Sequence, residues 1–282
     1  MRYKFIEEKI INLFMIAATL VVFGFFASII WIIAKTGFPS LTWEMISSLP
    51  GGGFYLGREG GILNAITGSL MIVFTSTLLG LVISIPIVFY MNVYLKKTSR
   101  LAYWARLSFD VLYGIPSIVY GAFGFIIMIL LGLKASLAGG IIVITFLIVP
   151  ILVRSMDEVA KSVSKDLLDA SYSLGATRLE TCKVVLRQIM PGIATATLLS
   201  VGRAIGDAAG VMFTAGFTDN IPTSLDEPAA TLSLSVFFQL SSPIPEVRER
   251  AYAAALLLTI IVLVLSIAGR IITNRFSKNK IK

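Results

Sequence analysis

The sequence predicts an all-α membrane protein with six transmembrane helices, and its composition, its long apolar stretches and the placement of its charges support this fold class. Of the 282 residues, 56% are hydrophobic and only 14% are charged. This balance leaves too few polar side chains to cover a water-soluble globule. A helix needs about 20 apolar residues to cross a hydrocarbon layer about 30 Å thick, and the chain contains six stretches of suitable length and polarity.

The six predicted spans are separated by short polar segments. They comprise residues 10–34, 65–95, 111–133, 135–153, 192–217 and 251–272. Only the fifth carries charges in its middle, at Arg203 and Asp207. Since no internal repeat or low-complexity tail divides the chain, we expect residues 1–282 to form a single transmembrane domain.

The basic residues predict the orientation of these spans. Eighteen of the 24 Lys and Arg residues lie on one predicted side of the membrane. The four segments that carry them are residues 1–9, 96–110, 154–191 and 270–282. Cytoplasmic loops are enriched in Lys and Arg, so both termini are expected in the cytoplasm of a multi-pass protein of the plasma or inner membrane. The first apolar run is too long for an ordinary cleaved signal peptide.

Several function classes are disfavoured by composition. The net charge of +8 lies beside apolar spans, which indicates contact with membrane lipid rather than with nucleic acid. The chain has no histidine and one cysteine, Cys182, so a metal centre or a His-based catalytic site is not expected. It also lacks a Gly-x-x-x-x-Gly-Lys-Ser/Thr loop for nucleotide phosphates. We therefore expect no catalytic residue, metal ligand or bound cofactor.

Two segments are predicted on the outer side. Residues 35–61 contain two glycine clusters, and we expect irregular structure with one short surface helix. Residues 218–250 carry five acidic and two basic residues and several prolines. A structured cap and a partner contact are both open interpretations of this second segment.

The predicted cytoplasmic segment 154–191 has the pattern of two short helices. Ser164 is placed to cap the first helix, and Gly175 fits the left-handed position that ends it. Thr177 and Glu180 then form a capping box for the second helix. Pro191 is expected to break this helix before the fifth span begins. Such helices can lie on the membrane surface, or their small residues can admit another protein closely.

This segment resembles the coupling loop of ABC importer permeases. The stretch from Asp169 through Ala170 and Ser171 to Gly175 is similar to the family's Glu-Ala-Ala-x-x-x-Gly motif, with Asp in place of Glu. The resemblance implies a type I ABC importer permease fold in which a two-helix coupling loop seats in an ATPase subunit. It thereby assigns coupling to Asp169, Ala170, Ser171, Gly175, Thr177 and Glu180.

The charged residues of the fifth span are candidates for function. Arg203 and Asp207 are spaced to share a helix face, and a charge at the middle of a membrane helix costs about 2.5–3.5 kcal/mol unless it faces protein or water. One interpretation is a salt bridge that fixes helix packing. The other is an anion path, because a guanidinium offers a planar fork of donors to phosphate or another oxyanion.

Two further stretches resemble the permease subunits of phosphate ABC importers. Residues 202–208 are similar to their Ala-Arg-Ala-x-Gly-Glu-Thr segment, and residues 114–121 match Gly-x-Pro-Ser-Ile-Val-x-Gly. The second match adds Pro116, expected to kink the third span, and Ser117, whose hydroxyl can face a cavity. Charge and spacing alone do not separate phosphate from sulfate or molybdate; the resemblance implies phosphate.

The resemblance also implies an assembly. It comprises a similar permease subunit, two cytosolic ATPase subunits that use ATP and Mg²⁺, and an external phosphate-binding protein. The main rival class is a secondary transporter, in which Arg203 and Asp207 would form an ion relay.

Overall fold

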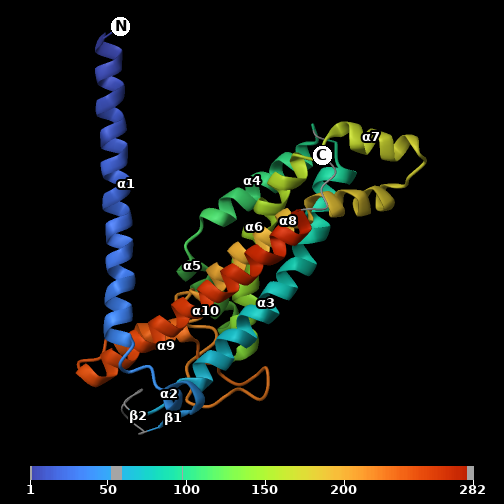
Figure 1. The fold of residues 1–282 in the computed structure, drawn as a ribbon. Coiled ribbons are helices and arrows are strands. Elements are labelled where there is room, and N and C mark those ends of the chain that lie inside the picture. The colour runs from blue at the N-terminus through green and yellow to red at the C-terminus, as the bar shows by residue number, and fades with distance from the viewer. Residues whose placement is uncertain (1, 52–58, 97, 278–282) are drawn as a thin grey trace.

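The computed structural model describes residues 2–51, 59–96 and 98–277, most of which are helical (Figure 1). Its helices are α1 (Arg2–Gly37), α2 (Trp43–Ser47), α3 (Leu63–Phe89), the π-helical turn η1 (Tyr90–Tyr94), α4 (Arg100–Gly114), α5 (Ser117–Leu130), α6 (Leu137–Lys161), α7 (Lys165–Ser173), α8 (Arg178–Ile205), α9 (Leu232–Leu240) and α10 (Pro245–Ser277). Two short antiparallel strands pair β1 (Pro50–Gly51) with β2 (Glu59–Gly60).

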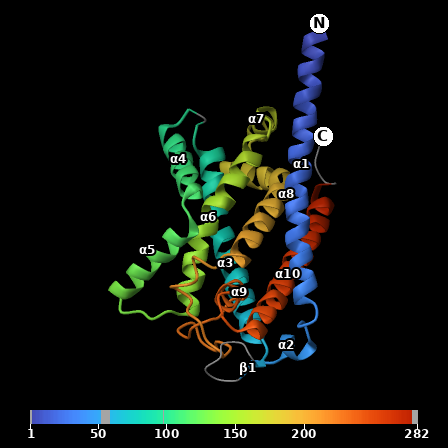
Figure 2. The ribbon, with the colours of Figure 1, turned by 90° about the vertical axis from the view of Figure 1, so that its left-hand side faces the viewer.

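Helix α6 forms the centre of the bundle and packs against α3, α4, α5 and α8 (Figure 2). In its apolar window 72% of the residues are buried, against none in that of α1. Ile144, Ile148 and Leu152 are fully buried along α6. Gly80 of α3 allows a close approach here, because a Cβ at that position would lie 2.9 Å from the Leu152 side chain. Burial of these side chains is what holds α3 and α6 together.

A second apolar cluster closes the end of the molecule that carries α2, the two strands and α9 (Figure 1). Met45, Ile62, Leu232 and Ala253 are buried in it. Helix α2 confirms the short surface helix expected within residues 35–61. Residues 52–58 of that segment lie outside the described part of the chain, as do residues 1, 97 and 278–282 of the basic segments.

Four of the predicted spans are confirmed as continuous helical segments, in α1, α3 with η1, α6 and α10. Among the described residues, five helices are long and apolar enough to cross a membrane, and the bent pair α4 and α5 can supply a sixth crossing. The all-α architecture with about six spans therefore follows from the apolar stretches in the sequence.

The predicted third span, 111–133, is wrong as one continuous helix. Helix α4 begins at Arg100, within the segment assigned to a cytoplasmic connection, and α5 leaves it at an angle of 98°. Ile115 and Pro116 between them are extended, with ψ of 129° and 142°. A proline disfavours helical geometry at the residue before it and donates no N–H of its own. Pro116 therefore separates two helices instead of kinking one.

The predicted boundaries of the fifth span, 192–217, are also wrong. Helix α8 passes through Pro191 without interruption and ends at Ile205, and residues 206–217 form turns. Proline costs a helix one backbone hydrogen bond. Pro191 is buried, and the Thr195 hydroxyl donates to its carbonyl oxygen over 3.0 Å. The second helix of the predicted cytoplasmic segment and the predicted fifth span therefore belong to one continuous helix.

The connection between α6 and α8 is correspondingly shorter than the predicted cytoplasmic segment 154–191. Helix α6 extends to Lys161, so only residues 162–177 connect α6 to α8, and α7 lies within this connection. Helices α4 and α7, the first turns of α1 and the last turns of α10 all lie at one end of the molecule (Figures 1 and 2). The segments that carry most of the basic residues therefore share one end.

Candidate functional site: a coupling elbow and a substrate path

We use the term coupling elbow for α7, the turn at Gly175 and the first turn of α8. The capping predicted from the sequence is confirmed. Ser164 Oγ accepts from the Leu167 N–H over 3.3 Å. Thr177 Oγ1 accepts from the Glu180 N–H, and Glu180 Oε2 accepts from the Thr177 N–H over 2.8 Å. Gly175 has a φ of 81°, a conformation that glycine adopts without strain. Local chemistry alone thus builds the elbow.

Two leucines are exposed on the otherwise polar surface of the coupling elbow. Leu174 is 89% exposed and Leu179 is 65% exposed, while Asp169 and Ala170 beside them are also exposed. Ser171 differs, since it is buried and its hydroxyl lies 3.2 Å from that of Thr181. Ser171 therefore fastens α7 to α8. Large exposed apolar side chains at the end of a bundle are typical of a protein contact.

The structure separates Arg203 from Asp207. Arg203 is exposed on α8, whereas Asp207 lies beyond the end of the helix and is 7% exposed. No ion pair or hydrogen bond of the described residues joins them. The expected shared helix face does not exist, because α8 ends at Ile205. The prediction of a salt bridge between these two residues is wrong.

Asp207 instead caps the turn that follows α8. Its Oδ2 accepts from the Gly210 N–H over 2.7 Å, and its carbonyl oxygen accepts from the Ser233 hydroxyl over 2.9 Å. Aspartate favours such local bonds to the backbone, which compete with continuation of a helix. Asp207 therefore ends α8 and ties the following turn to α9.

One exposed stripe runs along the half of α8 that contains Arg203. It comprises Thr195, Leu199, Gly202, Arg203 and Gly206, which are all exposed and recur at three- or four-residue intervals. A Cβ at Gly202 would meet no atom within 4 Å. Residues at this spacing share one face of a helix. Arg203 thus lies on a face of α8 that the chain itself leaves uncovered.

The start of α5 lies beside the turn that follows Arg203. A Cβ at Gly121 would approach the carbonyl oxygens of Ala209 and Gly210 to 2.8 and 2.9 Å. Pro116 is exposed and Ser117 is half-buried at the preceding bend. The structure therefore brings the segment that starts at Pro116 and Ser117 to the turn between Arg203 and α9.

One cluster of charged residues was not anticipated from the sequence. Arg106 of α4 and Asp157 of α6 form a salt bridge, with Nε and Oδ2 3.0 Å apart, and Asn92 of η1 also donates to Asp157. Both charged residues fall in segments assigned to solvated cytoplasmic connections. The only available signal was Lys161, which lies four residues after Asp157 and pairs with it.

Within the described part of the chain, no group of three or more His, Cys, Asp or Glu residues is placed to hold a metal ion. Besides the buried carboxylate of Asp207, the polar groups near the end of α8 are the exposed guanidinium of Arg203 and the hydroxyls of serines and threonines. Such groups donate hydrogen bonds to anions.

Comparisons with known proteins agree with this architecture. Residues 84–282 match the model of the family described as "Binding-protein-dependent transport system inner membrane component". The chain is 32% identical to the phosphate transport system permease protein PstA of Pasteurella multocida (strain Pm70) over 262 residues, 92% of each chain. It is 34% identical to PstA of Yersinia pestis over 222 residues, 78% of this chain and 74% of that relative.

A solved structure supports the same fold. An inward-facing structure of the MetNI methionine ABC transporter superposes with a TM-score of 0.61 at 18% identity, covering 76% of this chain and 95% of that chain. The residues matched by the family model, 84–282, contain η1, the coupling elbow and the exposed stripe. The chain belongs to the family of inner-membrane components of binding-protein-dependent transport systems.

Proposed function

We propose that this chain is the permease subunit of an ATP-driven phosphate importer, and that it forms the translocation path together with a second, similar permease. The observation that carries the proposal is Arg203, which lies on an uncovered face of α8 in a chain about one-third identical to phosphate permeases. Because Asp207 does not neutralise this guanidinium, its donors are available to an anion. Sulfate and molybdate are the competing substrates of similar chemistry.

The coupling elbow supports a role for a separate ATPase. Its exposed leucines offer an apolar contact, and the chain carries no phosphate-binding loop of its own for ATP. We infer that two cytosolic subunits bind ATP and Mg²⁺ and press on the coupling elbow of each permease. An external phosphate-binding protein would deliver substrate at the opposite end, near α2 and α9.

Transport of phosphate is tested by reconstitution of the complete importer in proteoliposomes, with sulfate and molybdate as competitors. We expect ATP-dependent accumulation of phosphate that excess sulfate does not suppress. Arg203→Ala should lower uptake about 10- to 100-fold, because hydrogen bonds to a charged group contribute about 1.5–3 kcal/mol each. Uptake by Arg203→Lys should lie between that of the wild type and that of Arg203→Ala, since lysine keeps the charge and loses the planar fork.

The matched control is Arg270→Ala, which removes an exposed arginine from the cytoplasmic end of α10. This variant should transport normally. Normal uptake by assembled Arg203→Ala would assign Arg203 to helix packing and would overturn its place on the path. Accumulation of sulfate in preference to phosphate would overturn the substrate.

The ATPase contact is tested at Gly175. A Cβ here meets no atom within 4 Å, but the φ of 81° strains a residue such as tryptophan, so Gly175→Trp both adds bulk at the elbow and disturbs its turn. We expect this variant to lose co-purification with the ATPase. Gly175→Asn should retain the partner, since asparagine tolerates positive φ. Equal recovery of the ATPase with both variants would contradict docking at the elbow.

A further inference from the structure

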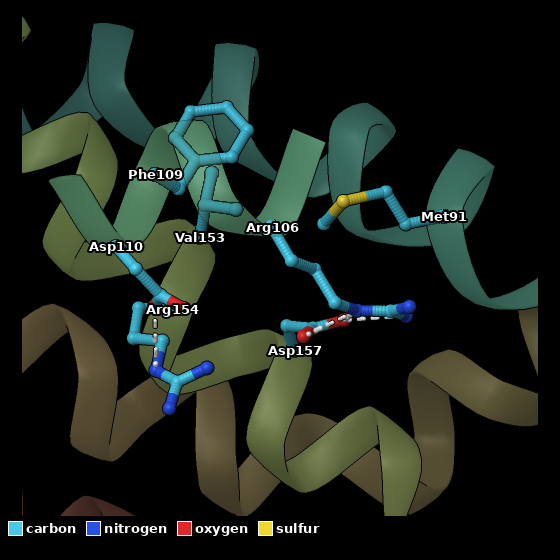
Figure 3. A pocket seen from close by; sticks show the side chains of 7 residues that line it. All are labelled: Met91, Arg106, Phe109, Asp110, Val153, Arg154 and Asp157. Atoms are coloured by element: carbon cyan, nitrogen blue, oxygen red, sulfur yellow. Dashed lines mark hydrogen bonds and ion pairs between the residues drawn. The ribbon is translucent and has the colours of Figure 1, made fainter. Parts of the chain in front are cut away.

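The cluster around Asp157 joins three elements through one buried carboxylate, and Figure 3 shows its contact with Arg106. Asp157 is only 2% exposed. Its Oδ1 accepts from Asn92 Nδ2 over 2.8 Å, and its Oδ2 accepts from Arg106 Nε over 3.0 Å and pairs with Lys161 Nζ at 2.7 Å. The Arg106 fork also reaches Asn92 Oδ1 through Nη2, over 3.2 Å. Helices α4 and α6 and the turn η1 are therefore held in one relative position.

The geometry of this cluster is strict. A buried carboxylate is stable only while its hydrogen-bond partners stay in place, because an unpaired buried charge is expensive. Arg106 contacts Asp157 through two nitrogens, Nε and Nη2. Such two-point contacts fix orientation as well as distance. A displacement of η1 or α6 must therefore move α4 or break the cluster.

The coupling elbow contacts the same turn η1 from its other side. The Arg178 guanidinium lies 5.7 Å from the centre of the Tyr94 ring, and its Nη1 donates to the Tyr94 carbonyl oxygen over 3.2 Å. Arg178 is the first residue of α8. Since Tyr94 and Asn92 belong to one π-helical turn, η1 connects the coupling elbow directly to the buried cluster. Single π-helical turns occur often at functional sites.

Helix α4 continues this connection toward the candidate path. It carries Arg106 near its middle and meets α5 at its C-terminal end, where the Tyr120 hydroxyl donates to the Leu112 carbonyl oxygen over 2.9 Å. Helix α5 then lies against the turn after Arg203 through Gly121. A continuous series of contacts therefore runs from Arg178 to the segment beside Arg203.

We propose that Arg106 and Asp157 are positioning residues for transport: with Asn92, Tyr94 and Arg178 they transmit movement of the coupling elbow through α4 to α5 at the candidate path. The inference rests on the proposed function, because it presupposes an ATPase that moves the elbow. It adds a second route beside α8 itself, which joins the elbow to Arg203 directly.

The test measures ATP hydrolysis and anion uptake by the complete reconstituted importer. Arg106→Gln should lower uptake per ATP hydrolysed about 2- to 30-fold, the range expected for residues that couple distant sites. The control is Arg154→Gln, which breaks the half-exposed pair of Arg154 with Asp110 between the same two helices, one turn away. This control should keep the wild-type ratio of anion uptake to ATP hydrolysis. Purely structural damage would instead reduce hydrolysis and uptake together.

Because Arg106→Gln can impair folding, a second pair of variants targets the exposed end of the route. Arg178→Gln and Tyr94→Leu should each lower the uptake ratio, and the double variant should lower it no further, because both act through one contact. Additive losses would overturn the connection through η1. An unchanged ratio in all of these variants would overturn it as well.

A distance measurement that needs no transported anion tests this proposal independently of which anion the importer carries. Spin labels at Ile118→Cys on α5 and at the exposed Leu263→Cys on α10, which belongs to neither route, in a Cys182→Ser background, report whether nucleotide binding moves α5. We expect a distance change in the parent and in Arg154→Gln that is lost in Arg106→Gln. Retention of the change in Arg106→Gln overturns the link even if phosphate is transported. Its loss supports the link even if the transported anion is not phosphate.

Discussion

At the scale of single residues, the separation of Arg203 from Asp207 has a chemical consequence. A guanidinium beside a carboxylate has its charge and donors partly satisfied, whereas Arg203 is exposed without an ion pair in the described structure. Asp207 has a different task, since its carboxylate holds the Gly210 N–H. The two residues should therefore respond differently to neutralisation.

Asp207→Asn tests this difference. Asparagine keeps an oxygen that accepts from the Gly210 N–H, so uptake and the hydrogen-exchange protection of residues 208–215 should stay close to wild type. Asp207→Ala should lose the cap and raise exchange there about fivefold, the effect of roughly 1 kcal/mol for a lost cap. If Asp207→Asn fails as badly as Asp207→Ala, the negative charge itself is required.

The residue-scale features that could be predicted are those with local causes. The caps at Ser164 and Thr177 and the turn at Gly175 depend on neighbours within a few positions, so the sequence contains all the necessary information. Arg106 and Asp157 are 51 positions apart. Their contact depends on how α4 packs against α6, and no spacing rule gives that.

At the scale of elements, two prolines that were both expected to distort a helix affect their helices in opposite ways. Pro116 separates α4 from α5, whereas Pro191 is accommodated inside α8. Pro191 is buried in the bundle, so tertiary packing compensates for the lost hydrogen bond. Pro116 is exposed, and the preceding residue adopts the extended geometry that a proline favours. The positions of both prolines are read from the sequence, but whether each one ends its helix depends on the packing around it.

The close approach of α5 to the turn after α8 is tested by Gly121→Ala. The added methyl would meet two backbone carbonyl oxygens below 3 Å, and overpacking of this kind costs about 1–3 kcal/mol. We expect a lower apparent melting temperature of the assembled permease. Gly114→Ala, where nothing lies within 4 Å, should not lower it. Equal melting temperatures would show that α5 can move away freely.

At the scale of the whole molecule, the positions of the helix ends and of the basic segments indicate the same orientation in the membrane. Helix α7, the start of α1 and the end of α10 share one end (Figure 1), the end that the positive-inside rule assigns to the cytoplasm. Helix α1 stands apart from the bundle in this view and packs mainly against α10. Its exposed apolar side chains suit lipid or a second membrane subunit.

The orientation predicts a labelling pattern for single cysteines in a Cys182→Ser background. Lys134→Cys, in the exposed turn before α6, should react with an impermeant thiol reagent on intact cells. Lys165→Cys, at the start of α7, should react only after the membrane is opened. The reverse pattern would invert the molecule and place the coupling elbow outside.

The continuity of α8 through Pro191 has a consequence for timing. Twenty-eight residues in one helix extend about 42 Å at 1.5 Å each, and this length contains both Leu179 and Arg203. Pro191 removes one backbone hydrogen bond between them, but the helix is not interrupted there, so the two positions are expected to shift in the same step. Nucleotide closure and reorientation of the guanidinium would then be simultaneous, and futile hydrolysis without delivery of cargo should be rare.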